Sequence, residues 1–153
     1  MSRAFVKEQD GGEAFEDLPD RPLSEHPNFV TPDGLAQIEA EVKRLEAEAA
    51  AVSPDDKADT ARVNRDLRYW TARKGTAQLV EKVVGETVHF GSTVTVVRED
   101  ETKQTFHIVG EDEADPTKGS LSYVSPLARA ITGKNIGDVV EVNGHEVEIE
   151  AIT

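Results

Sequence analysis

The fold of this chain is decided by the stretch from Val88 to Val142, VHFGSTVTVVREDETKQTFHIVGEDEADPTKGSLSYVSPLARAITGKNIGDVVEV. Within it and just after it, runs of β-branched residues are bounded by turn sequences rich in Asp, Asn, Gly and Pro. Asn143-Gly144 is a strong hairpin signal, because both residues of such a turn must tolerate positive φ. The pattern predicts a small sheet with strands at Thr93–Val97, Gln104–Val109, Ser120–Tyr123, Val139–Val142 and Glu146–Ile152.

One short helix is predicted among these strands. Ser125 is placed as its N-cap, and Pro126 occupies the first helical position, where no amide donor is needed. The helix is expected to run to Thr132, with Leu127 and Ile131 packing inward.

A helical hairpin is predicted upstream of the sheet. Thr31 and Pro32 form a cap-plus-proline start, and Ser53-Pro54 repeats the signal, so one helix ends and a second runs to about Val80. In the first helix the apolar residues step by 3 and 4, which is the seam of a coiled coil: Leu35, Ile38, Val42, Leu45, Ala49 and Val52. The second seam is predicted at Val63, Leu67, Trp70 and Ala77, with Lys74 in the remaining slot.

Five blocks of sequence carry a resemblance to a known family. They are FVTPDGLAQIEAEVKRL (Phe29–Leu45), FGSTVTV (Phe90–Val96), IVGEDEAD (Ile108–Asp115), SYVSPLARAI (Ser122–Ile131) and GKNIGDVVEV (Gly133–Val142). From about Asn28 onward the chain resembles the transcript-cleavage factors GreA and GreB. The resemblance implies an α+β fold, in which an antiparallel helical hairpin, a coiled coil, precedes an FKBP-like antiparallel sheet domain with one short helix.

This reading divides the chain into three segments. Residues 1–27 are an acidic arm rich in Gly and Pro, expected to be mobile or loosely docked. Residues 28–83 are the coiled-coil hairpin and residues 84–153 the C-terminal domain. Four apolar residues of the arm are candidates to pin it to the folded body: Phe5, Phe15, Leu18 and Leu23.

The resemblance implies RNA polymerase as the partner. The C-terminal domain would dock at the rim of the secondary channel, and the hairpin would enter it and promote cleavage of backtracked RNA by the polymerase. A regulator that occupies the same channel without stimulating cleavage is the alternative. A third reading, a peptidyl-prolyl isomerase, rests only on the FKBP-like domain and would need an aromatic-lined pocket, for which Phe90, Phe106 and Tyr123 are available.

Asp55, Asp56 and Asp59 lie at the predicted tip of the hairpin. In the family, acids at the tip help to hold a Mg²⁺ ion shared with the polymerase, and carboxylate oxygens suit that ion. The alternative is that these acids complement the dipole of the second helix. An alignment on the second helix also brings Arg62 and Arg65 close to the positions of the family's acids. No catalytic residue, cofactor or stably bound metal of its own is expected.

Two further groups are candidate contact residues. Arg62, Arg65 and Arg68 form a basic face on the second helix, as in the family; the alternative is that they pair with glutamates of the first helix. Val124, Ser125 and Pro126 correspond to the family's polymerase-contacting loop, although a purely structural role at a helix start is also consistent with them.

Composition limits the remaining possibilities. The 153 residues include no cysteine, which excludes disulfides and thiolate metal sites, and the net charge of −13 disfavours direct attraction of nucleic acid. Contact with RNA or DNA is therefore expected only through the polymerase complex. The four histidines lack metal-ligand spacing. With no apolar run long enough for a membrane helix and no signal-peptide pattern, we expect a cytoplasmic monomer that makes no contact with a membrane.

Overall fold

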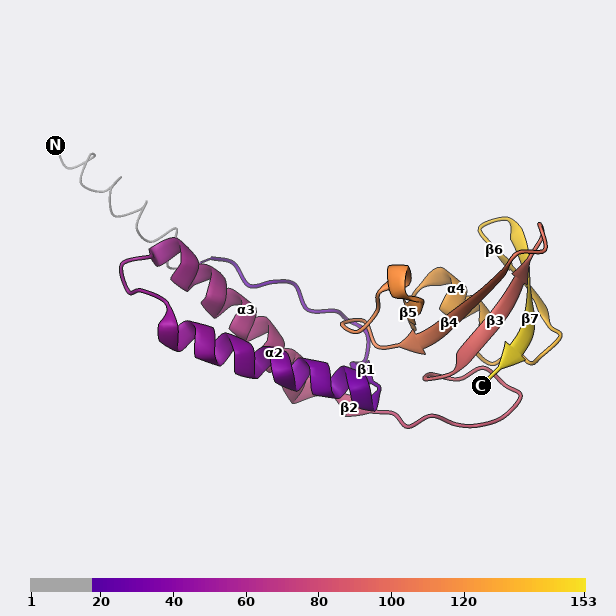
Figure 1. The fold of residues 1–153 in the computed structure, drawn as a ribbon, viewed down its shortest axis with the longest axis horizontal. Helices are drawn as coiled ribbons and strands as arrows, with labels where there is room; N and C mark the ends of the chain where they lie inside the picture. Colours follow the sequence, from indigo (N-terminus) through magenta and orange to yellow (C-terminus); the bar gives the residue numbers. More distant parts are fainter. Residues whose placement is uncertain (1–17) are drawn as a thin grey trace. The chain divides into compact units, whose positions relative to one another are not determined.

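The computed structural model describes residues 18–153, and its contacts divide the chain into two compact units. The hairpin unit contains residues 18–25 and 38–76, and the sheet unit contains residues 26–37 and 77–153 (Figure 1). The predicted boundaries at residues 28 and 84 differ from this division, because the segments entering and leaving the hairpin pair as strands within the sheet unit. Phe5 and Phe15 lie outside the described residues.

Two helices of 20 residues each, α2 (Pro32–Ala51) and α3 (Lys57–Thr76), form the hairpin. At 1.5 Å per residue each is about 30 Å long. On α2 the predicted seam is confirmed by Ile38, Val42 and Leu45, which are buried at spacings of 4 and 3. Within residues 18–153, no helix is long and apolar enough to cross a membrane.

The seam predicted on α3 is only partly correct. Val63 is fully buried, but Leu67 and Trp70 are half-buried and Lys74 is exposed. Arg73 is 3% exposed, so a charged side chain takes up part of the buried surface on this helix. The hairpin is therefore less apolar on its second helix than a heptad pattern predicts.

Both predicted ends of α3 need correction. The helix begins at Lys57 instead of Pro54, since Ser53 to Asp56 form a turn closed by the Asp56 amide donating to the Ser53 carbonyl at 3.0 Å. Proline favours the second position of such a turn as well as the first position of a helix. The helix ends at Thr76 instead of Val80, because the next residues leave it as a strand.

Thr31 caps α2 as predicted. The Gly34 amide donates to Thr31 Oγ1 at 3.0 Å, and the same hydroxyl donates to Glu113 Oε2 at 2.6 Å. Glu113 belongs to the IVGEDEAD block, 82 residues further along the chain. This block therefore supports the start of the first helix within the sheet unit.

A two-stranded ribbon joins the segments before α2 and after α3. β1 (Phe29–Val30) pairs in parallel with β2 (Gln78–Leu79). The Gln78 amide donates to the Asn28 carbonyl at 2.8 Å, and the Val80 amide donates to the Val30 carbonyl at 3.0 Å. Strands this short carry no period-2 signal, which is why the sequence did not reveal them.

The main sheet has five strands in the order β5-β4-β3-β7-β6. Their bounds are β3 Thr93–Arg98, β4 Lys103–Val109, β5 Ser120–Ser122, β6 Val139–Val142 and β7 His145–Ile152. Each agrees closely with a predicted strand. The sheet is mixed, however, and the expectation of a purely antiparallel sheet is wrong, because β4 and β5 pair in parallel. Their connection, which includes the short helix η1 (Pro116–Lys118), is long enough to return the chain in the same direction.

An aliphatic core lies between this sheet and α4 (Pro126–Ile131). Alternate residues of β3 and β7 point into it, as a half-buried sheet requires. Its fully buried members are Val88, Val94, Val96, Ile108, Ala128, Ile131, Val147 and Ile149.

The segment before α2 makes a close approach to the sheet at Gly110. A Cβ atom on Gly110 would lie 2.3 Å from the carbonyl oxygen of Phe29, so only glycine fits without a shift of the backbone. Beside it, the ring of Phe29 packs against Phe90 and Tyr123, with centroid distances of 6.0 and 5.3 Å. Two of the three aromatic residues considered for an isomerase pocket thus pack onto Phe29.

Candidate functional site

The three acids at the hairpin tip have three different environments. Asp56 is the N-cap of α3, because its Oδ1 accepts the Asp59 amide at 3.1 Å. The carboxylate of Asp59 accepts two hydrogen bonds from Arg62, at 2.9 and 2.7 Å. Asp55 is exposed, and its amide donates to Ser53 Oγ at 3.3 Å. Capping is thus observed at Asp56, three residues beyond the predicted N-cap, Ser53.

This arrangement does not form a ready metal site. Across residues 18–153 there is no group of three or more His, Asp or Glu side chains placed to hold a metal ion. Of the tip acids, Asp56 accepts a backbone amide and Asp59 accepts a guanidinium, while Asp55 and Asp56 are both exposed to solvent. The tip as it stands does not fit a Mg²⁺ ion, which prefers several oxygen ligands in octahedral geometry.

Arg62 is held by acids of both helices. Its Nη2 lies 2.5 Å from Glu48 Oε1 on α2 and 2.7 Å from Asp59 Oδ1 on α3. Hydrogen bonds with Glu48 and then Asp59 raise the pKa of Arg62 above its ordinary value. The Glu48 contact is the helix-to-helix pairing predicted as the alternative to a polymerase contact.

The other two arginines of the predicted basic face are also paired. Arg65 Nε lies 3.6 Å from Asp66 Oδ1 on the same helix. Arg68 Nε donates to Asp20 Oδ1 at 2.5 Å, and its Nη2 donates to the Leu18 carbonyl at 3.2 Å. Each arginine of this face therefore meets an acid of the same chain, and Arg62 meets a glutamate of the first helix.

The partner of Arg68 comes from the arm. Residues 18–25, which we call the strap, lie outside any helix or strand and run beside α3 (Figure 1). Arg21 Nη1 lies 3.5 Å from Asp66 Oδ1, and the guanidinium of Arg21 lies 3.9 Å from the centroid of the Tyr69 ring. Leu23, predicted as a pinning residue, is 52% exposed, whereas Leu18 is half-buried. Charge contacts therefore hold this part of the arm.

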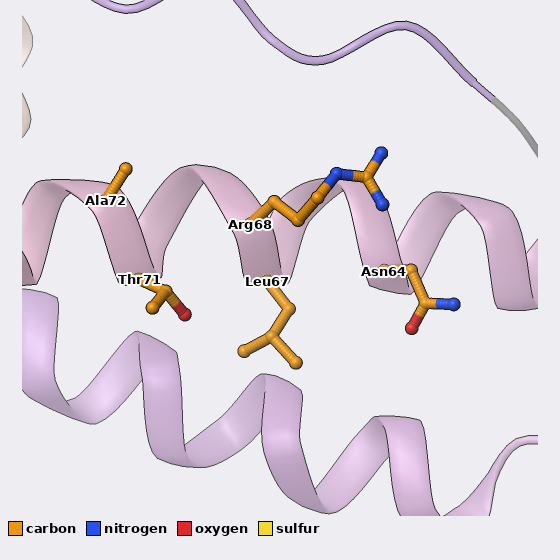
Figure 2. Close-up of a pocket in the computed structure, with 5 residues that line it drawn as sticks. All are labelled: Asn64, Leu67, Arg68, Thr71 and Ala72. Atoms are coloured by element: carbon orange, nitrogen blue, oxygen red, sulfur yellow. The ribbon is translucent and has the colours of Figure 1, made fainter.

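A shallow groove lies along α3 next to the strap contact. Its volume is about 520 Å³. Figure 2 shows Leu67 pointing toward the neighbouring helix and Arg68 pointing away from it, toward the extended segment. The residues that line the groove recur at helical spacing: Asn64, Leu67, Arg68, Thr71 and Ala72.

The loop from Ser122 to Pro126, which we call the docking loop, holds the predicted polymerase contacts. The Val124 amide donates to Ser122 Oγ at 3.2 Å, and the Ser125 amide donates to the Ser122 carbonyl at 3.0 Å. Ser125 occupies the N-cap position of α4, but its side chain makes no cap hydrogen bond, contrary to the prediction. Pro126 is exposed at the first helical position. The backbone of the loop is hydrogen-bonded to Ser122, and Pro126 is exposed to solvent.

Two turn acids of the sheet unit are stabilised as carboxylates. A hydrogen bond from the Thr117 side chain is the main cause that lowers the pKa of Asp115, and one from Thr102 does the same for Asp100. Two of the histidines have partners of other kinds: His107 Nε2 is 3.1 Å from the Gly91 carbonyl oxygen, and His145 Nδ1 is 3.7 Å from Glu99 Oε2.

Relatives match along most of the chain. Residues 82–153 match the family described as transcription elongation factor, GreA/GreB, C-terminal. Transcription elongation factor GreA of Rhodospirillum rubrum is 35% identical over 135 residues, which cover 74% of this chain and 86% of the relative. That of Mesorhizobium japonicum is 38% identical over 137 residues, covering 86% of this chain and 85% of the relative.

Solved structures with a similar chain course superpose loosely. GreA factor homolog 1 (Gfh1) of Thermus thermophilus has a TM-score of 0.42 at 18% identity, covering 84% of this chain and 99% of that one. The elongation factor GreA/GreB from Nitrosomonas europaea has a TM-score of 0.41 at 19% identity, covering 82% and 98%.

Proposed function

The chain belongs to the GreA/GreB family of transcription elongation factors, and we propose on this basis that it binds RNA polymerase as a Gre-type elongation factor. The observation that carries the proposal is the match to relatives named GreA over 85 to 86% of their length at 35 to 38% identity. Hairpin and sheet are both present in this chain, so both parts of the proposed mode of action are available.

In this proposal the sheet unit docks on the polymerase through the docking loop. A contact surface gains affinity when its backbone is already ordered, because less conformational entropy is lost on binding. The hydrogen bonds around Ser122 and the α4 start provide that order, and Pro126 is exposed beside them. A monomeric state and a cytoplasmic location belong to the same proposal.

The hairpin would then enter the secondary channel of the polymerase, where two activities are open to it. Stimulation of RNA cleavage requires tip acids as ligands of the polymerase Mg²⁺, which would supply Lewis-acid activation of a water. Asp59 would have to leave Arg62, and Asp56 would have to leave the helix cap. These contacts favour the second activity, regulation by occupying the channel without delivery of a metal.

Binding is tested with the full chain and core RNA polymerase. We expect Pro126→Asp to weaken binding at least tenfold, because a charge replaces an exposed apolar ring in the docking loop. Pro116→Asp is the matched control, since Pro116 is also exposed at the first position of a short helix, η1, and should bind as the wild type does. No binding by the wild type, or equal loss in both variants, contradicts the proposal.

Cleavage and regulation are separated with stalled, backtracked elongation complexes. At saturating Mg²⁺ we expect the wild type to bind without shortening the transcript. Should the wild type shorten it, and Asp55→Asn with Asp59→Asn abolish this while binding persists, the cleavage activity replaces regulation. Asp56 is left unchanged in this variant, because it caps α3 and its loss would alter the fold of the tip.

A further inference from the structure

The strap and α3 meet through a matched pair of opposite charges. An acid of the strap, Asp20, pairs with a base of the helix, Arg68, and the next strap residue, Arg21, pairs with an acid of the helix, Asp66. A shift of the strap along the helix would bring like charges together. The contact is therefore specific in register and is more than a general attraction between an acidic arm and a basic helix.

We propose that the strap, residues 18–25, is an autoinhibitory cover that must leave α3 before the hairpin can enter RNA polymerase. The inference rests on the proposed function and adds a form of regulation to it. The strap occupies Arg68 and the ring of Tyr69 at the same time.

The first reason is steric. A hairpin of two helices is about 20 Å across, since one helix with its side chains is about 10 Å in diameter. The strap contacts α3 through side chains and adds the thickness of one further chain to this width. A hairpin with the strap closed is thus wider along the part of α3 that contains Arg68.

The second reason is electrostatic. Arg62 and Arg65 are paired with acids of the hairpin itself and stay paired whether the strap is closed or open. Arg68 is paired with Asp20 of the strap. Opening the strap therefore exposes one new cation on this face, next to the groove lined by Leu67 and Thr71.

The contacts that close the strap are weak enough to reverse. The side chains of Arg68 and Asp20 are 48% and 73% exposed, and exposed ion pairs are individually weak and screened by salt. The stacking of Arg21 on Tyr69 adds a modest attraction. We infer that closed molecules outnumber open ones by about tenfold. A partner that binds only the open form would then show an apparent affinity lower by the same factor.

The first test uses single-charge variants of the full chain. Asp20→Asn removes the Arg68 partner, and we expect it to tighten binding to core RNA polymerase by roughly 3–10-fold at low salt, since less binding energy is spent on opening. Glu25→Gln is the matched control, because it removes one charge from another exposed acid of the strap. Its affinity should equal that of the wild type, and the gain of Asp20→Asn should shrink as salt rises.

A second test locks the strap shut. The chain has no cysteine, so an Asp20→Cys, Arg68→Cys double variant can be joined by a cleavable thiol crosslinker without side reactions. We expect the joined protein to bind core RNA polymerase more weakly than the same double variant after the linker is cut, a comparison in which both forms lack Arg68. Each single-cysteine variant, treated with the same reagent, should be unaffected by the cutting step.

The two proposals fail in different ways. If neither the wild type nor any variant binds polymerase, the proposed function is overturned and the strap loses its role with it. If the wild type binds but Asp20→Asn binds equally or more weakly, or if the locked protein binds as well as the cut one, the autoinhibitory strap is overturned while the proposed function stands.

Discussion

The sheet unit and the hairpin unit are held together by different interactions. In the sheet unit eight aliphatic residues from β3, β4, β7, α4 and the segment before β3 are buried against one another. In the hairpin unit α2 buries Ile38, Val42 and Leu45, whereas α3 buries Ala61 and Val63 together with an arginine, Arg73. The hairpin relies in addition on a cap at Asp56 and on ion pairs around Arg62.

This difference predicts different responses to the surroundings. Burial of aliphatic surface depends little on salt, whereas exposed ion pairs are screened by it. A protein that docks with one unit and inserts the other would benefit from this division, because the docking unit stays rigid while the surface of the inserted unit can exchange partners. Variants that alter one interaction at a time should therefore affect the two units differently.

The largest effect is expected in the sheet core. Ile149 is fully buried, and Ile149→Ala should destabilise the sheet unit by about 2–5 kcal/mol through lost burial and the cavity left behind. Hydrogen exchange of β3 and β7 in urea would report this loss. The single tryptophan, Trp70, lies in the hairpin, and its fluorescence should report a smaller loss of stability in that unit. Equal shifts in both signals would show that the two units unfold as one.

A smaller effect is expected at Leu67 on α3. Leu67 is half-buried, so Leu67→Ala should lower the stability of the hairpin by about 1–2 kcal/mol. The same substitution at a fully buried leucine would lower stability by more. Thermal unfolding followed by helical circular dichroism would measure it. Leu45→Ala on α2 provides the comparison, because Leu45 is fully buried and should cost more. The reverse order would mean that α3 contributes the larger part of the seam.

The sequence predicted the sheet unit better than the hairpin surface. Period-2 runs and Asn143-Gly144 located all five main strands, because a strand with one buried face repeats its pattern locally. The parallel pairing of β4 and β5 could not be read from it, since direction depends on the path of the connecting segment. The contact between Thr31 and Glu113 spans 82 residues and left no local signal.

The candidate sites show the same limit. Residue types pointed to Asp56 and Arg62 as functional candidates, but a cap and an ion pair use the same side chains as a metal site or a basic patch. Which use applies depends on neighbours such as Glu48, which lies 14 residues away on the facing helix. The sequence pattern suggested apolar residues of the arm as its anchors, but Asp20 and Arg21 make the contacts, and charged residues on an extended segment carry no periodic signal.

The cap at the hairpin tip is expected to give an effect of about 1 kcal/mol. Asp56→Ala removes the acceptor for the Asp59 amide and should lower hairpin stability by that amount. Asp55→Ala is the matched control, since Asp55 is exposed and precedes the cap, and it should change stability by less than about 0.5 kcal/mol. Urea unfolding monitored by Trp70 fluorescence would compare them. Equal losses would show that the two acids act together at the tip.

The smallest effect is expected at the turns of the sheet unit, where it tests whether that unit also depends on local hydrogen bonds. The Thr117 hydroxyl donates to Asp115 Oδ1 at 2.5 Å and is the main cause of the lowered pKa of Asp115. A lowered pKa in the folded state adds stability that is present above the ordinary pKa and is lost as pH falls through the folded value. Thr117→Val should therefore raise the pKa of Asp115 toward its ordinary value and reduce this acid sensitivity, as carboxyl ¹³C NMR titration would measure. Thr102→Val should do the same for Asp100 and leave Asp115 unchanged. A shift of both acids in either variant would mean that the turns are coupled through the sheet, and the sheet unit would then resemble the hairpin in its dependence on charge.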